Sequence, residues 1–410
     1  MKTNSPCRSC GTPLHRTFVD LGLSPLANAY LRPDQLRCME PLYPLHVHVC
    51  DACLLVQLEE FESPSHIFSD YFYFSSFSQL WLDHAQSYAG RMCGELGLGA
   101  GSLVVEIASN DGYLLQYFKE QGVPVLGVEP AANVAKAAVE KGIPTDVAFF
   151  GQETARRLRA RGVVPDLIAA NNVLAHVPDL NDFVAGFKTL LAPAGTITVE
   201  FPHLMRLISE LQFDTIYHEH FSYFSLLAVE KVFERHQLTI FDVEELPTHG
   251  GSLRLFVSHA GTRAVSPRVA ALRETERAAG LHRPETYGSF AEAVVRTKCD
   301  ILEFLINARR AGKRVAAYGA PAKGNTLLNY CGIGPELVAF TVDRSPHKQG
   351  HFLPGSHIPI LAPSAIFERR PDCVLILPWN LKDEIAGQLA GIRDWGGQLV
   401  VTIPTVEVLS

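Results

Sequence analysis

Ser102-Leu-Val-Val-Glu-Ile-Ala-Ser-Asn-Asp-Gly-Tyr-Leu-Leu115 is the stretch that decides the fold. Residues 102–107 are apolar except at Ser102 and Glu106, which is typical of a buried strand in a parallel sheet. A polar turn at 108–112 follows, and an apolar helix is expected to start at Tyr113. A strand, a glycine-containing turn and a helix in this order predict a βαβ unit with its ligand at the carboxyl end of the strand.

The alternation of strand and helix continues toward the carboxyl side. We expect further strands at 125–128, 166–170 and 195–201, and an antiparallel hairpin at the sheet edge made by 239–245 and 252–258. Glu129 ends the second strand about 20 residues after the first turn, which is the position from which a carboxylate reaches ribose hydroxyls. Asn171 and Asn172 follow the third strand.

A second α/β unit is predicted after a helical connection at 265–313. Its expected elements are strands at 314–318, 338–342, 373–377 and 398–403, and a helix at 325–330. The loop Gly319–Gly324 places backbone N–H groups and Lys323 at a helix start, which suits a phosphate. This loop lacks the Gly-x-Gly-x-x-Gly pattern of a dinucleotide site.

Two Cys-x-x-Cys pairs precede both units: Cys7 with Cys10, and Cys50 with Cys53. Four thiolates aimed by tight turns form the ligand set of a structural zinc site with no position left for substrate. A redox dithiol is the alternative, but a thioredoxin-type motif needs a strand before it and a helix after it. We therefore predict a zinc ion that stabilises a small amino-terminal fold.

Tyr217-His-Glu-His220 is the densest concentration of chemical groups. In an extended segment His218 and His220 would point the same way, and in a helix they would diverge. General acid–base chemistry is the leading interpretation, because histidine titrates near neutral pH. A His-x-His metal site and a purely structural polar cluster remain alternatives.

Composition excludes several classes of protein. The chain has 410 residues, 47% of them hydrophobic, and a net charge of -7, which gives no basic surface for nucleic acid. No apolar run approaches the ~20 residues of a membrane span, and the first residues lack the apolar stretch of a signal peptide. We expect a cytoplasmic protein of three domains that acts as a monomer, without nucleic-acid or membrane partners.

Glu106, Glu129 and the antiparallel hairpin together resemble the fold of S-adenosylmethionine (SAM) methyltransferases. Along nearly the whole chain, seven motifs in one order resemble the sugar-nucleotide C-methyltransferases of deoxysugar biosynthesis, such as the 3-C-methyltransferases that make branched sugars. The motifs are the two cysteine pairs, Tyr71-Phe-Tyr-Phe-Ser-Ser76, Glu106-Ile-Ala-Ser-Asn-Asp-Gly112, Asn171-Asn-Val-Leu-Ala-His-Val177, Tyr217-His-Glu-His-Phe-Ser222, His249-Gly-Gly-Ser-Leu-Arg254 and Tyr318-Gly-Ala-Pro-Ala-Lys-Gly324.

The resemblance implies an α/β protein with a zinc-binding domain at 1–65, a Rossmann-like SAM methyltransferase domain at 66–260 and a second Rossmann-like domain, which holds the nucleotide-sugar, at 261–410. It implies methyl transfer from SAM to C3 of a nucleotide-linked 4-keto-6-deoxysugar. His220 would be the base that forms the enolate, Tyr217 and His176 would hold the enolate oxygen, and Glu219 would orient an imidazole or bind a sugar hydroxyl.

The remaining site residues follow from the same resemblance. Those for SAM are Glu106, Ala108, Asn110, Gly112, Glu129, Asn171 and Asn172. Tyr71 is placed with the catalytic group. Those for the substrate are Tyr73, Ser75, Ser76, His218, His249, Ser252, Arg254, Lys323 and Asn325. The aromatic residues at 71–77 could instead pack between domains, and 249–254 could be only a hairpin turn.

Other functions stay open at the level of the sequence. Methylation at another carbon or another ketone is the nearest alternative. A nucleotide-sugar oxidoreductase or epimerase would use NAD on the carboxy-terminal unit, with Asp343 at the ribose. A zinc-anchored interaction protein would bind neither cofactor.

Overall fold

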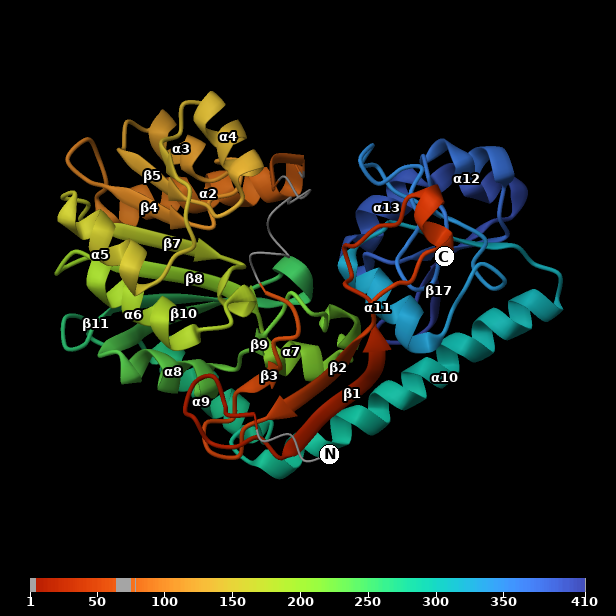
Figure 1. Cartoon of the computed structure of the whole chain (residues 1–410), viewed down its shortest axis with the longest axis horizontal. Helices are drawn as coiled ribbons and strands as arrows, with labels where there is room; N and C mark the ends of the chain where they lie inside the picture. The colour runs from red at the N-terminus through yellow and green to blue at the C-terminus, as the bar shows by residue number, and fades with distance from the viewer. Residues whose placement is uncertain (1–4, 64–74, 78, 410) are drawn as a thin grey trace.

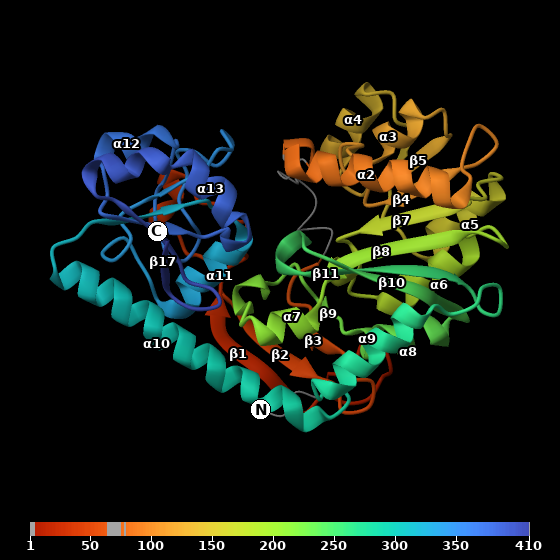
Figure 2. The same cartoon turned by 180° about the vertical axis from the view of Figure 1, so that it is seen from behind.

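Two α/β lobes stand side by side above a base formed by the amino-terminal strands and one long helix (Figure 1). The computed structural model describes residues 5–63, 75–77 and 79–409. Seen from behind, the long helix α10 (Ser289–Arg310) runs along the base from the middle lobe to the carboxy-terminal lobe (Figure 2). No helix in the described part of the chain has the length and apolarity needed to span a bilayer.

The middle lobe is built on a seven-stranded sheet in the order β10-β11-β8-β7-β4-β5-β6. Five strands are parallel, and the β10–β11 hairpin is antiparallel, with β11 on β8 and β10 at the edge. This arrangement confirms the predicted βαβ units and edge hairpin. The strands are β4 (Val104–Ile107), β5 (Val125–Val128), β6 (Thr145–Asp146), β7 (Leu167–Asn171), β8 (Thr196–Pro202), β10 (Leu238–Leu246) and β11 (Ser252–His259).

Helices cover both faces of this sheet. The buried side chains of α2 (Gln79–Leu96) and α3 (Leu115–Glu120) share one apolar cluster, which Ala138 of α4 (Ala132–Glu140) joins. The opposite face is covered by α5 (Gln152–Ala160), α6 (Leu180–Leu190), α8 (Leu226–Arg235) and α9 (Pro267–Ala278). A strand buried on both faces must be apolar throughout, as the fully buried Val-Val-Glu-Ile of β4 is, except at Glu106.

The amino-terminal unit is a four-stranded antiparallel sheet in the order β1-β2-β3-β9. It comprises β1 (Arg16–Ser24), β2 (Tyr43–Val49), β3 (Val56–Leu58) and β9 (Ser222–Tyr223). The sequence did not predict this sheet. Its fourth strand comes from the segment that follows the Tyr217–His220 cluster, so backbone hydrogen bonds join the zinc-binding unit to residues next to that cluster.

The carboxy-terminal lobe has a six-stranded sheet in the order β14-β13-β12-β15-β16-β17. The expected strand at 338–342 is only two residues long, and the strand expected to be the last is followed by antiparallel β17. The strands are β12 (Val315–Tyr318), β13 (Thr341–Val342), β14 (Ile360–Leu361), β15 (Cys373–Ile376), β16 (Gln398–Val401) and β17 (Glu407–Leu409). Its helices are α11 (Ala322–Cys331), α12 (Ser364–Arg369) and α13 (Lys382–Gln388).

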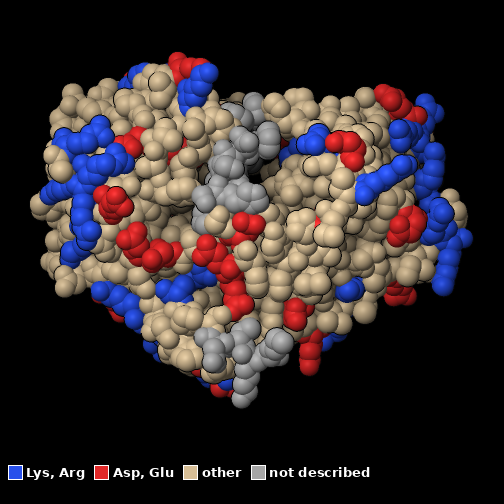
Figure 3. All heavy atoms as spheres, in the orientation of Figure 1, with Lys and Arg blue, Asp and Glu red and all other residues tan. Residues whose placement is uncertain are grey.

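One apolar core joins the amino-terminal sheet to α10 and the carboxy-terminal lobe. The Phe18 ring of β1 stacks on Phe290 of α10, with 4.6 Å between centroids. The remaining helical elements are short: α7 (Leu204–Ser209), η1 (Pro33–Arg37), η2 (Ser75–Phe77), η3 (Leu174–His176), η4 (Phe213–Thr215), η5 (Thr248–Gly250), η6 (Pro284–Gly288), η7 (Trp379–Leu381) and η8 (Ala390–Trp395). The space-filling view shows a hollow between the lobes, beside the residues drawn in grey (Figure 3).

Candidate active site and structural metal centre

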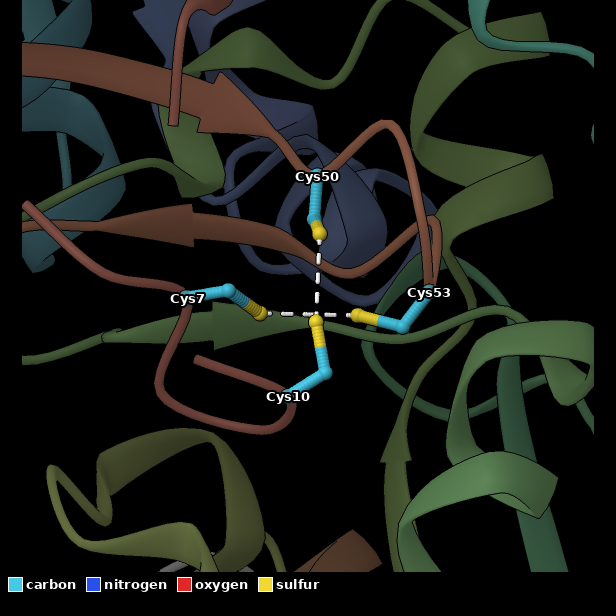
Figure 4. A group of neighbouring side chains, drawn as sticks. All are labelled: Cys7, Cys10, Cys50 and Cys53. Carbon is cyan, nitrogen blue, oxygen red and sulfur yellow. Dashed lines mark hydrogen bonds between the residues drawn. The ribbon is translucent and has the colours of Figure 1, made fainter. Parts of the chain in front are cut away.

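The four predicted metal ligands converge on one point (Figure 4). The Sγ atoms of Cys7, Cys10, Cys50 and Cys53 all lie within 4.8 Å of one another. Each pair forms a turn in which the residue after the second cysteine adopts a left-handed conformation, Gly11 in the first turn and Leu54 in the second. The Gln57 side chain donates a hydrogen bond to Cys7 Sγ at 3.1 Å. Four sulfur ligands at this spacing fit a tetrahedral zinc ion.

The loop after β4 is tightly folded. Ala108, Asn110 and Gly112 all have positive φ. A Cβ on Gly112 would lie 3.0 Å from Ile143 Cγ1, so a larger residue would not fit there without movement. Asn110 N donates to Glu129 Oε2 at 2.9 Å, and Asn110 Oδ1 accepts from Ser75 N at 2.9 Å. The structure thus brings the loop, Glu129 and Ser75 together.

Glu106 lies at the base of this loop and is 1% exposed. Neither of its carboxylate oxygens has a hydrogen-bond partner of normal geometry among the described residues, and the same is true of Asn171 Oδ1. Burial raises the pKa of Glu106 well above its usual range, and the Tyr113 hydroxyl opposes the rise. Apart from the Tyr113 hydroxyl, these buried acceptors have no donor among the described residues, which fits a ligand that brings a cationic donor, such as the ammonium group of SAM.

Glu129 stands at the end of β5 with both oxygens held by backbone N–H groups, those of Asn110 and of Ala131 at 2.8 Å. Each oxygen can accept a second hydrogen bond, so the carboxylate remains able to bind ribose hydroxyls. Burial raises the pKa of Glu129, and the two backbone donors oppose the rise. Asn172, at the end of β7, has φ of 53° and donates its N–H to Glu200 O.

His220 is held in one tautomer. Its Nδ1 lies 2.9 Å from the carbonyl oxygen of Thr215, which can only accept, so Nδ1 carries the proton. Nε2 therefore presents a lone pair, which accepts from the Tyr217 hydroxyl at 2.9 Å. Burial lowers the pKa of His220 well below its usual value, with a further contribution from His176. A neutral imidazole with an available Nε2 is a competent base.

His176 lies beside His220, with ring centroids 4.7 Å apart in an edge-on arrangement. Burial lowers the pKa of His176 to about 4. His249 is a third neutral imidazole, because burial and Lys323 lower its pKa to about 4. The pKa of His220 is also lowered by His249 and Lys323, so these four groups lie in one region, which we call the histidine region.

His218 and Glu219 face away from His220, because residues 217–220 form a turn in which His220 N–H bonds to Tyr217 O. His218 Nε2 donates to Pro44 O at 3.1 Å, and its ring packs against Tyr43 of the amino-terminal sheet. Glu219 Oε1 accepts from Asn28 Nδ2 at 2.6 Å. Burial raises the pKa of Glu219 to about 7. An extended segment would have placed His218 and His220 on one side, but residues 217–220 form a turn and the two side chains point in different directions.

Lys323 lies at the junction with the carboxy-terminal lobe. Its Nζ donates to Asn380 Oδ1 at 2.7 Å and lies 4.5 Å from the centre of the Trp379 ring. The indole N–H of Trp379 donates to Asp214 Oδ2 at 2.7 Å, and burial raises the pKa of Asp214 to about 6. Asn325, two residues further along α11, is 1% exposed and neither amide atom has a partner among the described residues.

The other predicted substrate residues are placed as follows. Ser76 Oγ accepts from Lys141 Nζ at 2.9 Å, and Ser252 Oγ donates to Thr248 O at 2.9 Å. Arg254 is 3% exposed and its guanidinium binds Glu200, its cross-strand neighbour on β8. Arg254 therefore forms a buried ion pair inside the sheet, and its role toward substrate stays a prediction. Tyr71 and Tyr73 lie outside the described residues.

Sequence reasoning missed several residues at this site. Trp81 of α2 stacks on Tyr113, which directly follows the 108–112 loop (the cofactor loop), at 5.9 Å between centroids and contacts His249 edge-on at 5.2 Å. It therefore links the cofactor loop to the histidine region. Asp214 and Trp379 were also missed. The aromatic residues carry no motif, but Asp214, three residues before Tyr217, could have been found from its nearness to the cluster.

Comparison with known proteins identifies the class. Three family models match in order: “Putative zinc binding domain” over residues 7–68, “Methyltransferase domain” over 84–243 and “C-methyltransferase C-terminal domain” over 247–404. The C-methyltransferase NovU of Streptomyces niveus is 38% identical over 405 residues, which cover 98% of this chain and 96% of the relative. Together with the fold and the cofactor loop, these matches define a SAM-dependent methyltransferase with a structural zinc site.

More distant matches cover only part of the chain. A ubiquinone biosynthesis O-methyltransferase from Methylobacterium sp. (strain 4-46) is 32% identical over 127 residues, 29% of this chain and 50% of the relative. The solved PH0226 protein from Pyrococcus horikoshii OT3 is 16% identical, with a TM-score of 0.38 over 48% of this chain and 99% of the other. The chain belongs to the C-methyltransferase family with an amino-terminal zinc-binding domain. This confirms the family, fold class and cofactors predicted from the motifs.

Proposed function

We propose that the enzyme transfers the methyl group of SAM to C3 of a nucleotide-linked 4-keto-6-deoxysugar, with His220 as the base. The observation that carries this proposal is the fixed tautomer of His220, in which the Thr215 carbonyl holds Nδ1–H and Nε2 is left as an acceptor. A neutral buried imidazole abstracts a proton only from a carbon acid that is already activated, and a C4 ketone activates the adjacent C3–H in this way.

The groups around His220 fit the charge that develops in such a step. As the C3–H bond breaks, the proton moves to His220 Nε2 and negative charge grows on the C4 oxygen. The Tyr217 hydroxyl, which bonds to Nε2 at 2.9 Å without substrate, becomes available to donate to that oxygen. Lys323 adds positive potential in the same region. SAM supplies an electrophilic methyl group, so the C3–CH₃ bond forms as the sulfonium S–CH₃ bond breaks.

The same proposal assigns a separate role to each lobe of the chain. The middle lobe would hold SAM through Glu106, the 108–112 loop and Glu129. The carboxy-terminal lobe would hold the nucleotide-sugar near Lys323 and Asn325. Residues 1–65, 66–260 and 261–410 remain our proposed domains, although β9 and α9 pack across these boundaries.

A reaction panel tests the proposal. The protein, SAM and a set of nucleotide 4-keto-6-deoxysugars are incubated, and the products are analysed by mass spectrometry and by NMR of the methylated carbon. We expect a gain of one methylene at C3 and a loss of roughly 10²–10⁴-fold in rate for His220→Asn. His282→Asn is the matched control, because His282 is an exposed histidine. Methylation of no keto-sugar, with SAM bound, would exclude this substrate class, and a fully active His220→Asn variant would exclude the base.

A further inference from the structure

An arginine lies inside the first cysteine turn and reaches the middle lobe. The Arg8 guanidinium donates through Nη1 to Pro178 O at 3.0 Å and through Nη2 to Leu58 O. It also lies 5.3 Å from the centre of the Phe221 ring. None of the ion pairs among the described residues includes Arg8, so its direct contacts are carbonyl oxygens and an aromatic face, while Glu60 and Asp179 act on it only at longer range.

The groups that Arg8 contacts flank the two histidines. Pro178 follows His176 by two residues, and Phe221 directly follows His220. Both backbone polar groups of Phe221 are hydrogen-bonded. Its N–H donates to Ala175 O at 2.7 Å, and its carbonyl accepts from Leu58 N at 3.0 Å. These contacts form a closed ring of hydrogen bonds. Arg8 bonds to Leu58, Leu58 to Phe221, Phe221 to the 175–178 segment, and that segment to Arg8.

The metal turn holds the other end of Arg8. Its backbone N–H donates to Gln57 Oε1 at 2.9 Å, and the same Gln57 side chain donates to Cys7 Sγ. Asn181, in the first turn of α6, donates to the carbonyls of Arg8 and Ser9, each at 3.0 Å. A planar guanidinium can bind two carbonyls in fixed directions, which the single ammonium of lysine cannot reproduce.

We propose that Arg8 is a positioning residue that fixes the spacing of His176 and His220, and so couples the metal turn to the acid–base site. This inference rests on the proposed function only for the role of the two histidines. Without Arg8, the Pro178 and Leu58 carbonyls lose their common donor. The 175–178 segment can then shift relative to Phe221, while the four cysteines and the cofactor loop keep their own contacts.

Arg8→Met and Arg8→Lys test the proposal, and Arg16→Met is the matched control. Arg16 lies in the same amino-terminal unit, and its exposed side chain pairs with Asp51 between the second pair of cysteines. The first measurement needs no substrate. We expect faster hydrogen–deuterium exchange at 173–178 and 217–223 in both Arg8 variants, with unchanged zinc content and unchanged SAM affinity. We expect no change in these segments for Arg16→Met.

The second measurement uses turnover. Because a displacement of about 1 Å costs up to ~10²-fold, we expect kcat to fall by roughly 10–100-fold in both Arg8 variants, with the KM for SAM unchanged. A third variant, Arg8→Ala, leaves space for a small cation, so added guanidinium should partly restore its kcat and should not restore that of Arg8→Lys. Unchanged exchange at both segments, or loss of zinc together with a general loss of protection, would overturn the proposal. If wild type methylates no keto-sugar, the proposed function fails while the exchange measurement still decides the role of Arg8.

Discussion

The buried carboxyl of Glu106 gives a quantitative prediction about SAM binding. In the free protein, burial raises the pKa of this carboxyl well above its usual range, so the protonated form is favoured. A bound cationic donor favours the ionised form. SAM binding should therefore release a proton at pH values between the pKa of this carboxyl in the complex and its raised pKa in the free protein, and the affinity for SAM should increase as the pH rises toward the raised pKa.

The size of the effect follows from the contacts that Glu106 can make. A hydrogen bond to a charged group contributes about 1.5–3 kcal/mol, which corresponds to roughly 10- to 150-fold in affinity. Glu106→Gln keeps the shape and removes the charge, so we expect SAM to bind weaker by that factor where the wild-type carboxylate is ionised. The affinity of the variant should not vary with pH through this group.

Isothermal titration calorimetry of SAM or its demethylated product measures both effects. Titrations across a pH series give the affinity, and buffers with different ionisation enthalpies count the protons released. Glu120→Gln, at the exposed end of α3, is the control for a charge change in the same lobe. Equal affinities for wild type and Glu106→Gln, with no difference in proton release, would refute the assignment of Glu106 to the SAM ammonium.

Three further predictions concern stability. Burial raises the pKa of Glu219 to about 7 from its usual value of 4.5, so its stabilising contribution is present below pH 4.5 and is lost as the pH rises through 7. In urea unfolding, the Glu219→Gln variant should therefore be more stable than wild type by about 1–3 kcal/mol at pH 8 but not at pH 4.5. A difference in unfolding free energy that does not change with pH would show that the titration of Glu219 is not its cause. Arg254→Met should lower the unfolding free energy by about 3–5 kcal/mol, because it removes the permanent cation that pairs with the buried Glu200 carboxylate and leaves only His84 beside it. The double variant Arg254→Met with Glu200→Gln should recover part of this loss, and no recovery would refute the pairing. Cys50→Ser should lower zinc content, measured by metal analysis, and expose the amino-terminal unit to protease, whereas Cys38→Ser, at an exposed cysteine outside the cluster, should do neither.

The parallel strands could be predicted because each is short, apolar and followed by polar residues. The strand at 125–128 matches β5, and the expected edge hairpin is observed as β10 and β11. The strand expected at 338–342 is shorter in the structure, where it is β13, because only Thr341 and Val342 pair with both neighbouring strands. Local pattern specifies such elements, and tertiary pairing decides their length.

Long-range partners could not be predicted. The strand β9 has two residues and pairs with β3 across more than 160 positions of sequence, which no local signal reveals. The directions of His218 and His220 depend on a turn whose geometry is fixed by Pro44 and Thr215, residues that have no motif in common. The metal ligands were easier to predict from the sequence, because a Cys-x-x-Cys pair places both thiolates by local geometry alone.

The place of β9 in the amino-terminal sheet has a consequence for the order in which the chain folds during synthesis. Both cysteine turns are complete once residue 53 has left the ribosome, so metal can bind early. The edge of β3 at Val56–Leu58 stays open until residues 222–223 arrive, after most strands of the next lobe have been made. An open edge pairs readily with other strands. A nascent chain arrested before residue 222 should therefore be the form of this protein most prone to aggregate.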